Sequence, residues 1–276
     1  QRRILYAMHQ AGLRHSAKYV KSARITGNTM AYFHPHGDAP IYEAMARMAQ
    51  DFSLRYPLVD GQGNWGCFTK DTKVKLTDGR NLSFEDLIKE WGAGKKNYTF
   101  TINSLDLISI TEIKNPRLTK KSAKLIKIIL DNGEEIKCTP NHRFLLKDGI
   151  YKEAQFLTPE DSLMPIYQKL SEKTDRLNRD GYVFVYQSKK DEWIPVHHLA
   201  DNYNLTNGIY KKSDGRVRHH IDFNKLNNNP DNIKRIGWGE HWRIHHQHAS
   251  EQHKNPEYRK KLAEGRLRYL ATPETK

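Results

Sequence analysis

The sequence contains only two cysteines in 276 residues, Cys67 and Cys138. Two thiols exclude a disulfide scaffold, and because no pair of Cys-x-x-Cys motifs is present, a structural zinc knuckle is excluded too. The sequence also lacks a signal peptide and any apolar run of the roughly 20 residues that a membrane helix needs. We therefore expect a protein of the reducing cytoplasm, without a membrane partner.

Negative charge is scarce as well: 46 Lys and Arg stand against 32 Asp and Glu, a formal net charge of +14. So basic a chain fits a polyanionic partner, and we expect double-stranded DNA. A basic surface without such a partner is the alternative, and the clustering of histidines described below weighs against it. The length allows two or more domains, each with its own core.

The pattern of the chain changes abruptly at the bond between Gly66 and Cys67, with no flexible linker between the two patterns. A thiol directly after a glycine is the arrangement that an N-to-S acyl shift needs. The thiolate attacks the preceding carbonyl, and glycine has no side chain to obstruct the attack. This junction predicts an inserted element that begins at Cys67 and removes itself.

Before the junction, helical spacing of apolar residues predicts one helix at the start of the chain and a second from Pro40 to about Phe52. Between them, His34 and His36 stand in a predicted turn near several basic residues. Two imidazoles presented in this way can hold a phosphate. The alternative is a turn with surface histidines and no ligand.

The strings QRRILYAM, KSAR, HPHGD and RMAQDFSLRYPLVDGQGNWG occur in the order typical of the A subunits of bacterial type II topoisomerases. Residues 1–66 thus resemble the A subunit of DNA gyrase or of topoisomerase IV. The resemblance implies a short helical segment of a DNA-cleavage domain, with Arg3, His34 and His36 near the scissile phosphate. For the spliced parent it implies homodimerisation and a partner like the B subunit of gyrase.

The tyrosine nucleophile that this family carries downstream of GQGNWG is absent from the chain, so we expect no topoisomerase cleavage by this segment. The chain also starts within a helical pattern and stops without a closing motif. We expect a fragment of a longer reading frame.

After the junction the sequence predicts mostly β-structure. Alternating residues predict a strand over 67–76, and Asp78–Gly79 predicts a tight turn. Ser83 is the predicted cap of a helix over 84–91. Further strands are predicted over 98–102, 107–114, 125–130, 135–138 and 143–146.

Thr139, Asn141 and His142 follow one of these strands and supply what chemistry at Cys67 requires. His142 can give a proton to the departing amide nitrogen. Thr139 and Asn141 can stabilise the oxyanion or hold the peptide twisted. His142 alone would be interpreted as an ordinary loop histidine, and Cys138 as a small buried side chain.

The start at Cys67 and the string CTPNHRFLL resemble the two N-terminal motifs of inteins. The resemblance implies a Hint fold, a flat β-rich horseshoe that excises itself and joins its flanks. A complete intein ends in strands that carry a His-Asn dipeptide, and none occurs in this chain. We therefore expect a horseshoe that lacks its C-terminal strands and a reaction that stops at the thioester or at N-terminal cleavage.

Nine of the fourteen histidines lie between His197 and His253. His219 and His220 end a predicted strand, and His241 and His245 share one face of a helix predicted from Glu240. Four such imidazoles can surround a divalent metal, which stabilises the charge of a phosphodiester while a neutral imidazole activates water. The alternative is a solvated, histidine-rich stretch.

The order HHID, Asn-Asn, Pro-Asp-Asn-Ile and His-x-x-x-His, preceded by VHHLA, resembles the HNH homing endonucleases, which have a ββα-metal fold. The resemblance makes His220 the general base and puts His219 at a metal-ligand position. Asn232 either ligates or orients the loop, and His241 and His245 are ligands or phosphate contacts. Mg²⁺ is the usual ion of the family, whereas imidazoles suit softer metals, so the identity of the divalent ion stays open.

The predicted fold class is multidomain α+β. The predicted domains are the topoisomerase-like segment 1–66, the splicing domain 67–166, the endonuclease 167–250 and a basic helical tail over 251–276. The tail either neutralises DNA phosphates or is a solvated basic face. Two other interpretations remain: a topoisomerase subunit with a decayed insert, and a basic DNA-binding module without catalysis.

Overall fold

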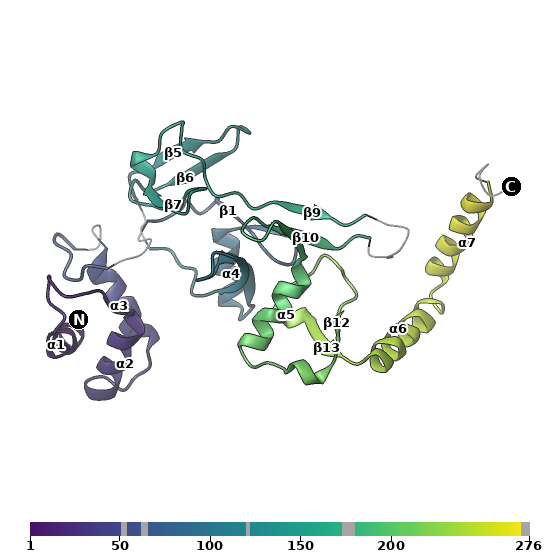
Figure 1. Cartoon of the computed structure of the whole chain (residues 1–276), viewed down its shortest axis with the longest axis horizontal. Coiled ribbons are helices and arrows are strands. Elements are labelled where there is room, and N and C mark those ends of the chain that lie inside the picture. The colour runs from purple at the N-terminus through teal and green to yellow at the C-terminus, as the bar shows by residue number, and fades with distance from the viewer. Residues whose placement is uncertain (51–53, 62–65, 120–121, 173–179, 272–276) are drawn as a thin grey trace. The chain divides into compact units, whose positions relative to one another are not determined.

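The computed structural model describes residues 1–50, 54–61, 66–119, 122–172 and 180–271. Its mixture of helices and strands confirms the predicted α+β class. The chain forms two compact units, Gln1–Thr69 with Thr119–Met164, and Lys70–Leu118 with Pro165–Lys276. Both units join segments that are distant in sequence (Figure 1). The domain boundaries predicted from the sequence stay predictions.

Three helices open the first unit: α1 (Arg2–Gln10), α2 (Ser22–Tyr32) and α3 (Ala39–Ala49). The first and third confirm the predicted helices, and Pro40 lies in the first turn of α3. Asp51–Ser53, with the predicted end of that helix, lie outside the described residues. The three helices share a core of Ile4, Ile25, Ile41, Met45, Met48 and Val59.

The sequence does not predict α2, whose buried face includes two threonines instead of aliphatic residues alone. Thr26 and Thr29 donate their hydroxyls to the carbonyls of Ser22 and Ile25, at 2.6 and 2.8 Å. These bonds satisfy the buried hydroxyls within the helix, which is why a polar pattern is compatible with burial here.

Two antiparallel hairpins form the β-part of the first unit. β5 (Ile126–Ile129) pairs with β6 (Glu135–Cys138), and β7 (Arg143–Leu145) pairs with β8 (Tyr151–Glu153). β5, β6 and β7 confirm the strands predicted over 125–130, 135–138 and 143–146, whereas β8 was not predicted. An isolated bridge joins Phe68 to Cys138, so the chain that enters at the junction lies along the end of β6.

The second unit begins with β1 (Lys73–Lys75), β2 (Asn81–Ser83) and α4 (Phe84–Gly92), followed by the hairpin of β3 (Asn97–Ile102) and β4 (Ile108–Ile113). Gly79 has φ +89° in the predicted turn, a conformation that favours glycine. Ser83 caps α4 by accepting a hydrogen bond from the backbone of Asp86 at 3.1 Å. The strand predicted over 67–76 is shorter than expected, because only residues 73–75 pair with β2.

The rest of the second unit comprises a three-stranded sheet, a two-stranded hairpin and three α-helices. The elements are β9 (Gln168–Leu170), β10 (Val183–Gln187), β11 (Glu192–Pro195), α5 (Val196–Thr206), β12 (Val217–His220), β13 (Ile233–Ile236), α6 (Trp238–Gln252) and α7 (Pro256–Ala271). Their core joins Val185, Val196, Leu199, Ala200 and Ile233 to Tyr98 and Ile110 of the β3–β4 hairpin. The β12–β13 hairpin thus packs on α5, and α6 follows it in the chain. The hairpin and α6 together carry most of the clustered histidines.

Asp201 of α5 is fully buried and ties the β12–β13 hairpin to that helix. Its carboxylate accepts hydrogen bonds from Arg235 at 2.6 Å and from Arg218 at 2.8 Å. Burial acts to raise the pKa of Asp201, but the two arginines outweigh it and the pKa is lowered. Sequence patterns gave no sign of this network, since its members lie up to 34 residues apart.

We predict that Asp201→Asn lowers the free energy of unfolding by about 3 kcal/mol or more, because it leaves two arginines beside a buried site without their counter-charge. Chemical denaturation followed by circular dichroism measures the change. The control is Asp106→Asn, which breaks an exposed pair with Lys189 and should cost less than about 1 kcal/mol. Equal losses in the two variants would contradict the prediction.

The same network makes stability depend on pH. Because the pKa of Asp201 is lowered in the folded state, its contribution is present above the unfolded-state pKa. It is lost as the pH falls through the folded-state pKa. The stability difference between the parent chain and Asp201→Asn should therefore shrink at acidic pH.

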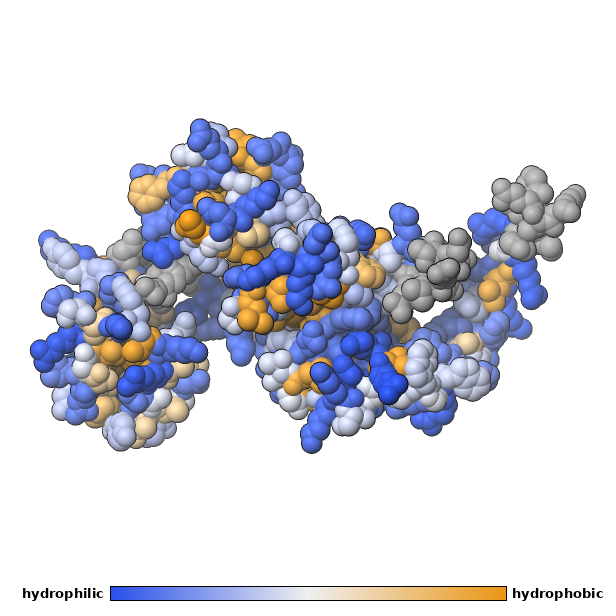
Figure 2. All heavy atoms as spheres, viewed as in Figure 1, coloured by the Kyte–Doolittle hydropathy of each residue, from blue (hydrophilic) through white to orange (hydrophobic). Residues whose placement is uncertain are grey.

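Hydrophilic side chains cover most of the face shown in Figure 2, with hydrophobic ones in smaller patches. Among the described helices, none combines the length and the apolarity needed to cross a bilayer.

Candidate functional sites

Thr139 holds the backbone of Cys67 on both sides. The amide nitrogen of Cys67 donates to the hydroxyl of Thr139 at 2.9 Å, and the carbonyl of Cys67 accepts from the amide of Thr139 at 2.9 Å. This amide nitrogen belongs to the Gly66–Cys67 peptide bond. The structure therefore brings the predicted Thr139 directly to the bond that an acyl shift would break, while Gly63, Asn64 and Trp65 lie outside the described residues.

Thr139 and His142 are the two ends of a turn, closed by a hydrogen bond from the amide of His142 to the carbonyl of Thr139. His142 contacts the Gly66 side of the same peptide bond. Its ring centroid lies 4.0 Å from that of Phe68 and 5.0 Å from that of Phe144, so the imidazole is buried. Burial lowers the pKa of His142 to about 4, and a hydrogen bond with the backbone of Gly66 acts in the opposite direction. At neutral pH the imidazole is uncharged, and burial makes its protonated form a stronger acid, which favours delivery of a proton to the departing amide nitrogen.

Asn141 lies within this turn, and Cys138 is the last residue of β6. Asn141 is half-buried, and among the hydrogen bonds of the described residues none joins its side chain to the Gly66–Cys67 bond. Its catalytic role stays a prediction. Cys138 is fully buried, and burial raises the pKa of its thiol to about 11, which is the inert behaviour expected from the sequence.

Thr119 is a neighbour of the thiol that the sequence did not predict. Its hydroxyl oxygen lies 3.2 Å from the sulfur of Cys67, although the two residues are 52 positions apart. Thr119 stands between two predicted strands and carries no motif, so no sequence signal could have found it.

The close fit of Gly66 against His142 allows a test of the geometry. A Cβ added at Gly66 would lie 2.6 Å from the backbone nitrogen of His142, closer than real contacts allow. We predict that Gly66→Ala shifts the scissile bond and slows thiol-induced cleavage on the order of 100-fold. Gel electrophoresis of the released fragment measures it.

The control for this prediction is Gly27→Ala in α2, where an added Cβ meets nothing within 4 Å. If Gly66→Ala is cleaved at the wild-type rate, the contact between Gly66 and His142 does not position the scissile bond.

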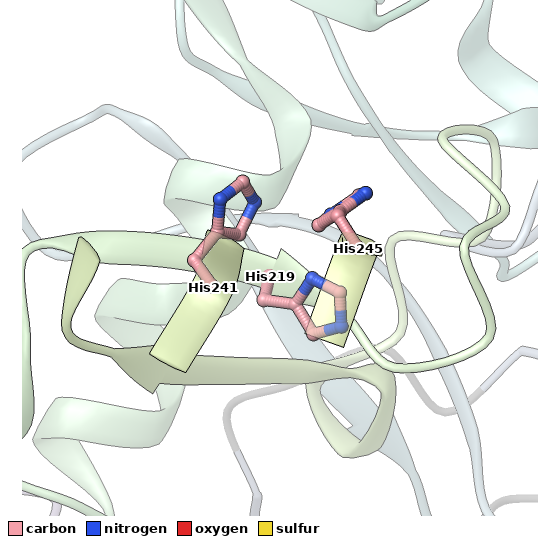
Figure 3. A group of neighbouring side chains, drawn as sticks. All are labelled: His219, His241 and His245. Carbon is pink, nitrogen blue, oxygen red and sulfur yellow. The ribbon is translucent and has the colours of Figure 1, made fainter. Parts of the chain in front are cut away.

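In the second unit, three of the predicted histidines converge. His219 of β12 and His241 and His245 of α6 each offer a nitrogen, and these nitrogens all lie within 4.8 Å of one another (Figure 3). Burial and then the neighbouring imidazoles lower the pKa of His219 to about 4, and burial lowers that of His245. Neutral imidazoles are the form that binds metal, and such a donor set suits zinc, cobalt, nickel or copper better than magnesium.

His220 faces a different partner from its neighbour in the sequence. Its Nε2 lies 3.2 Å from the amide oxygen of Asn228, and both side chains are buried. The amide nitrogen of Asn228 donates to the carbonyl of Leu226 at 3.1 Å, so its oxygen is the acceptor. His220 then carries its hydrogen on Nε2 and keeps Nδ1 as the basic nitrogen, while burial lowers its pKa.

Asn228 was not predicted from the sequence, although the run Asn227-Asn228-Asn229 contains it. Three consecutive asparagines give no sign of which one points inward. Asn228 is 1 % exposed, and its hydrogen bond to His220 makes it an orienting residue for that imidazole.

Asn232 uses both ends of its side chain to hold the loop between β12 and β13. Its amide nitrogen donates to Asp222 and to the carbonyl of Asn227, each at 2.8 Å, and its oxygen accepts from the amide of Asp222 at 3.1 Å. The sequence left two roles open for Asn232, metal ligation and orientation of the loop. These contacts fit the second role. Ligation of a metal by Asn232 stays a prediction.

Other side chains surround His220 and were not singled out from the sequence. The rings of Tyr182 and His197 lie 5.9 and 5.4 Å from that of His220. The ammonium of Lys225 lies 5.0 Å from the ring of Tyr182, which brings a positive charge near the imidazole. A cation in this position can contact a phosphate.

The three residues predicted to contact DNA in the first unit lie together. Arg3 of α1 lies within hydrogen-bond distance of His34, at 2.9 Å, and the rings of His34 and His36 are 4.8 Å apart. Arg3 and His36 are exposed and His34 is half-buried, and the cluster joins α1 to the segment before α3. Its contact with a phosphate stays a prediction.

Comparison with protein families divides the chain near the junction. Residues 1–75 match the family formed by the A subunits of DNA gyrase and topoisomerase IV, and residues 74–260 match the intein splicing domain. The first finding confirms the resemblance of the N-terminal region, and the second confirms that of the splicing element.

Individual relatives cover different shares of the chain. The B subunit of DNA gyrase from Synechocystis sp. is 42% identical over 233 residues, which are 79% of this chain and 21% of that protein. The A subunit of DNA gyrase from Aminobacterium colombiense is 56% identical over 90 residues, 32% of this chain and 11% of the relative. The A subunit of DNA topoisomerase 4 from Haemophilus influenzae is 52% identical over 103 residues, 36% of this chain and 14% of the relative. The chain thus spans about a fifth or less of the length of these relatives.

Two solved intein structures are similar to part of the chain. A DnaB intein of Synechocystis sp. PCC 6803 is 27% identical, with a TM-score of 0.29, over 44% of this chain and 79% of that one. A mutant of an Ssp DnaB mini-intein is 23% identical, with a TM-score of 0.31, over 44% and 77% of the two chains.

Proposed function

The chain belongs to the intein splicing domain family, and from this premise we propose that it catalyses an N-to-S acyl shift at the Gly66–Cys67 bond. The observation that carries the proposal is the pair of hydrogen bonds between Cys67 and Thr139. His142 adds a hydrogen bond with the backbone of Gly66, on the other side of the scissile peptide bond. The meeting of the two family matches at residues 74–75, shortly after Cys67, supports an element inserted into a topoisomerase-like sequence.

In the proposed reaction the sulfur of Cys67 bonds to the carbonyl carbon of Gly66, and the bond from that carbon to the nitrogen of Cys67 breaks. His142 accepts the thiol proton and delivers it to this nitrogen, which becomes the free amine of Cys67. Thr139 holds the nitrogen in place by its hydroxyl. The product is a thioester at Gly66, which an added thiol can cleave.

Incubation of the full chain with dithiothreitol tests the proposal. We expect release of residues 1–66 and a second fragment that begins at Cys67, both identified by mass spectrometry. A chain that stays intact over many hours in the reagent would overturn the acyl shift.

We further propose that residues 167–250, which lie within the second unit, form a metal-dependent HNH endonuclease that cleaves double-stranded DNA. The convergence of His219, His241 and His245 beside the oriented His220 favours this second activity. A divalent metal bound there would supply positive charge to the scissile phosphate. Nδ1 of His220 takes a proton from water, Asn228 fixes the imidazole, and Asn232 holds the loop.

Metal binding can be measured apart from cleavage. We predict that the EDTA-treated chain binds Co²⁺ with the visible absorption of a nitrogen-coordinated ion. The variant with both His241→Ala and His245→Ala should lose affinity by more than the roughly 10–100-fold that loss of an outer-shell partner costs. Competition with Zn²⁺ and Mg²⁺ should rank zinc far ahead.

The control for metal binding is His246→Ala. This exposed histidine stacks on Trp242 and does not belong to the three-histidine cluster. Binding unchanged in the double variant would refute the site, and so would loss of binding in the control alone.

For the spliced parent we propose a cytoplasmic type II topoisomerase subunit that binds DNA, dimerises and pairs with a partner like the B subunit of gyrase. The match of residues 1–75 supports this proposal. In that parent, Arg3, His34 and His36 would contact the scissile phosphate, and their proximity here fits such a role.

A further inference from the structure

The thiol of Cys67 has a specific polar neighbour within its own compact unit. The sulfur lies 3.2 Å from the hydroxyl oxygen of Thr119, close enough for a hydrogen bond in either direction. Thr119 and Cys67 belong to two different segments of that unit. The contact therefore depends on the folded unit and does not follow from proximity in sequence.

Thr139 and His142 contact the backbone of the reacting bond and not its sulfur. The nitrogen and the carbonyl of Cys67 both bond to Thr139, and His142 bonds to the backbone of Gly66. Thr139 and His142 thus hold the backbone of the scissile bond. Thr119 is the residue whose side chain the structure places on the sulfur.

We propose that Thr119 is a further catalytic residue of the acyl shift: its hydroxyl donates a hydrogen bond to the sulfur of Cys67 and stabilises the thiolate that attacks Gly66. This inference rests on the proposed splicing function. A thiol can either donate or accept, whereas a thiolate can only accept, so the hydroxyl must become the donor as the proton leaves. A hydrogen bond to a charged acceptor is about twice as strong as a neutral one, so the contact strengthens along the reaction.

The step balances without another reactant. The thiol proton leaves the sulfur for His142 and ends on the amine of Cys67, while the hydroxyl of Thr119 keeps its own proton throughout. The sulfur–carbon bond forms at Gly66 as the carbon–nitrogen bond to Cys67 breaks. Thr119 thus stabilises the negative charge on the sulfur and orients it toward Gly66, and it takes no part in proton transfer.

The test compares Thr119→Val, which removes the hydroxyl at nearly constant shape, with Thr119→Ser, which keeps it. The first readout is the rate of alkylation of Cys67 by iodoacetamide as a function of pH, followed by peptide mass spectrometry. The fully buried Cys138 is counted separately by its own peptide. The second readout is the rate at which dithiothreitol releases residues 1–66 from the full chain.

We expect Thr119→Val to slow both the alkylation of Cys67 at near-neutral pH and the release of residues 1–66 by about tenfold, because the thiolate loses a charge-assisted hydrogen bond. Thr119→Ser should restore both. The control Thr158→Val removes a surface hydroxyl that donates to Asp161 and should change neither readout.

An unchanged alkylation profile in Thr119→Val overturns the proposal, whatever the rate of release. A serine variant that behaves like the valine variant overturns it too, because the hydroxyl is then not the cause. If the wild-type chain releases no fragment but Thr119→Val still slows alkylation of Cys67, the hydrogen bond to sulfur stands and the splicing function is the part that fails.

Discussion

Cys67→Ala should abolish release of residues 1–66 by dithiothreitol, with a loss of at least about a thousandfold, as expected when a covalent nucleophile is removed. Without the sulfur no thioester can form at Gly66. The hydroxyls of Thr139 and Thr119 do not replace it, because the structure uses them as hydrogen-bond partners of Cys67. The measurement is the time course of the released fragment on a gel, with each band confirmed by mass.

The matched control for this variant is Cys138→Ala, which removes the chain's other thiol. Cys138 is fully buried and its pKa is raised to about 11, so it takes no part in the proposed chemistry. Its replacement should leave release within a few-fold of wild type. Equal release from Cys67→Ala and from the wild-type chain would mean that cleavage does not pass through this sulfur.

The second large effect is expected in the second unit, where His220→Ala should reduce cleavage of supercoiled plasmid about 10²- to 10⁴-fold, the range that loss of a general base costs. Asn228→Ala should cut at a rate between those of His220→Ala and the wild type, because the imidazole stays but loses the contact that fixes its tautomer. Agarose gels run with Mg²⁺, Mn²⁺ and Zn²⁺ measure nicked and linear products.

His253→Ala is the matched control for His220, since this exposed histidine stands at the end of α6 and packs on Tyr258. It should cut like the wild type. If His220→Ala cuts equally well, the general base is another residue. If no variant cuts but the wild-type chain binds DNA in a salt-dependent way, the second unit is a basic DNA-binding module without catalysis.

Local signals in the sequence were sufficient for most of the elements. The cap at Ser83, the turn at Gly79 and the four-residue spacing of His241 and His245 depend on neighbours within a few residues, and all three are confirmed. The Gly-Cys junction and the turn at Thr139 were found for the same reason, since each is a short motif whose chemistry can be deduced from residue types.

The contacts that complete the sites were beyond such reasoning. Thr119 reaches Cys67 across 52 positions, and Arg235 reaches Asp201 across 34. Neither pair leaves a periodic pattern, because each joins elements that only tertiary packing brings together. Asn228 stands between two other asparagines, and the sequence does not distinguish it from them. Its burial and its hydrogen bond to His220 show its role.

The central claim is that Gly66 moves from nitrogen to sulfur, and trapping the ester tests it most directly. Neutral hydroxylamine, added to the full chain without any thiol, should convert Gly66 into a hydroxamate and leave a new amino terminus at Cys67. Mass spectrometry that finds both products would support the acyl shift. An intact chain in hydroxylamine, or a break at any other bond, would contradict it.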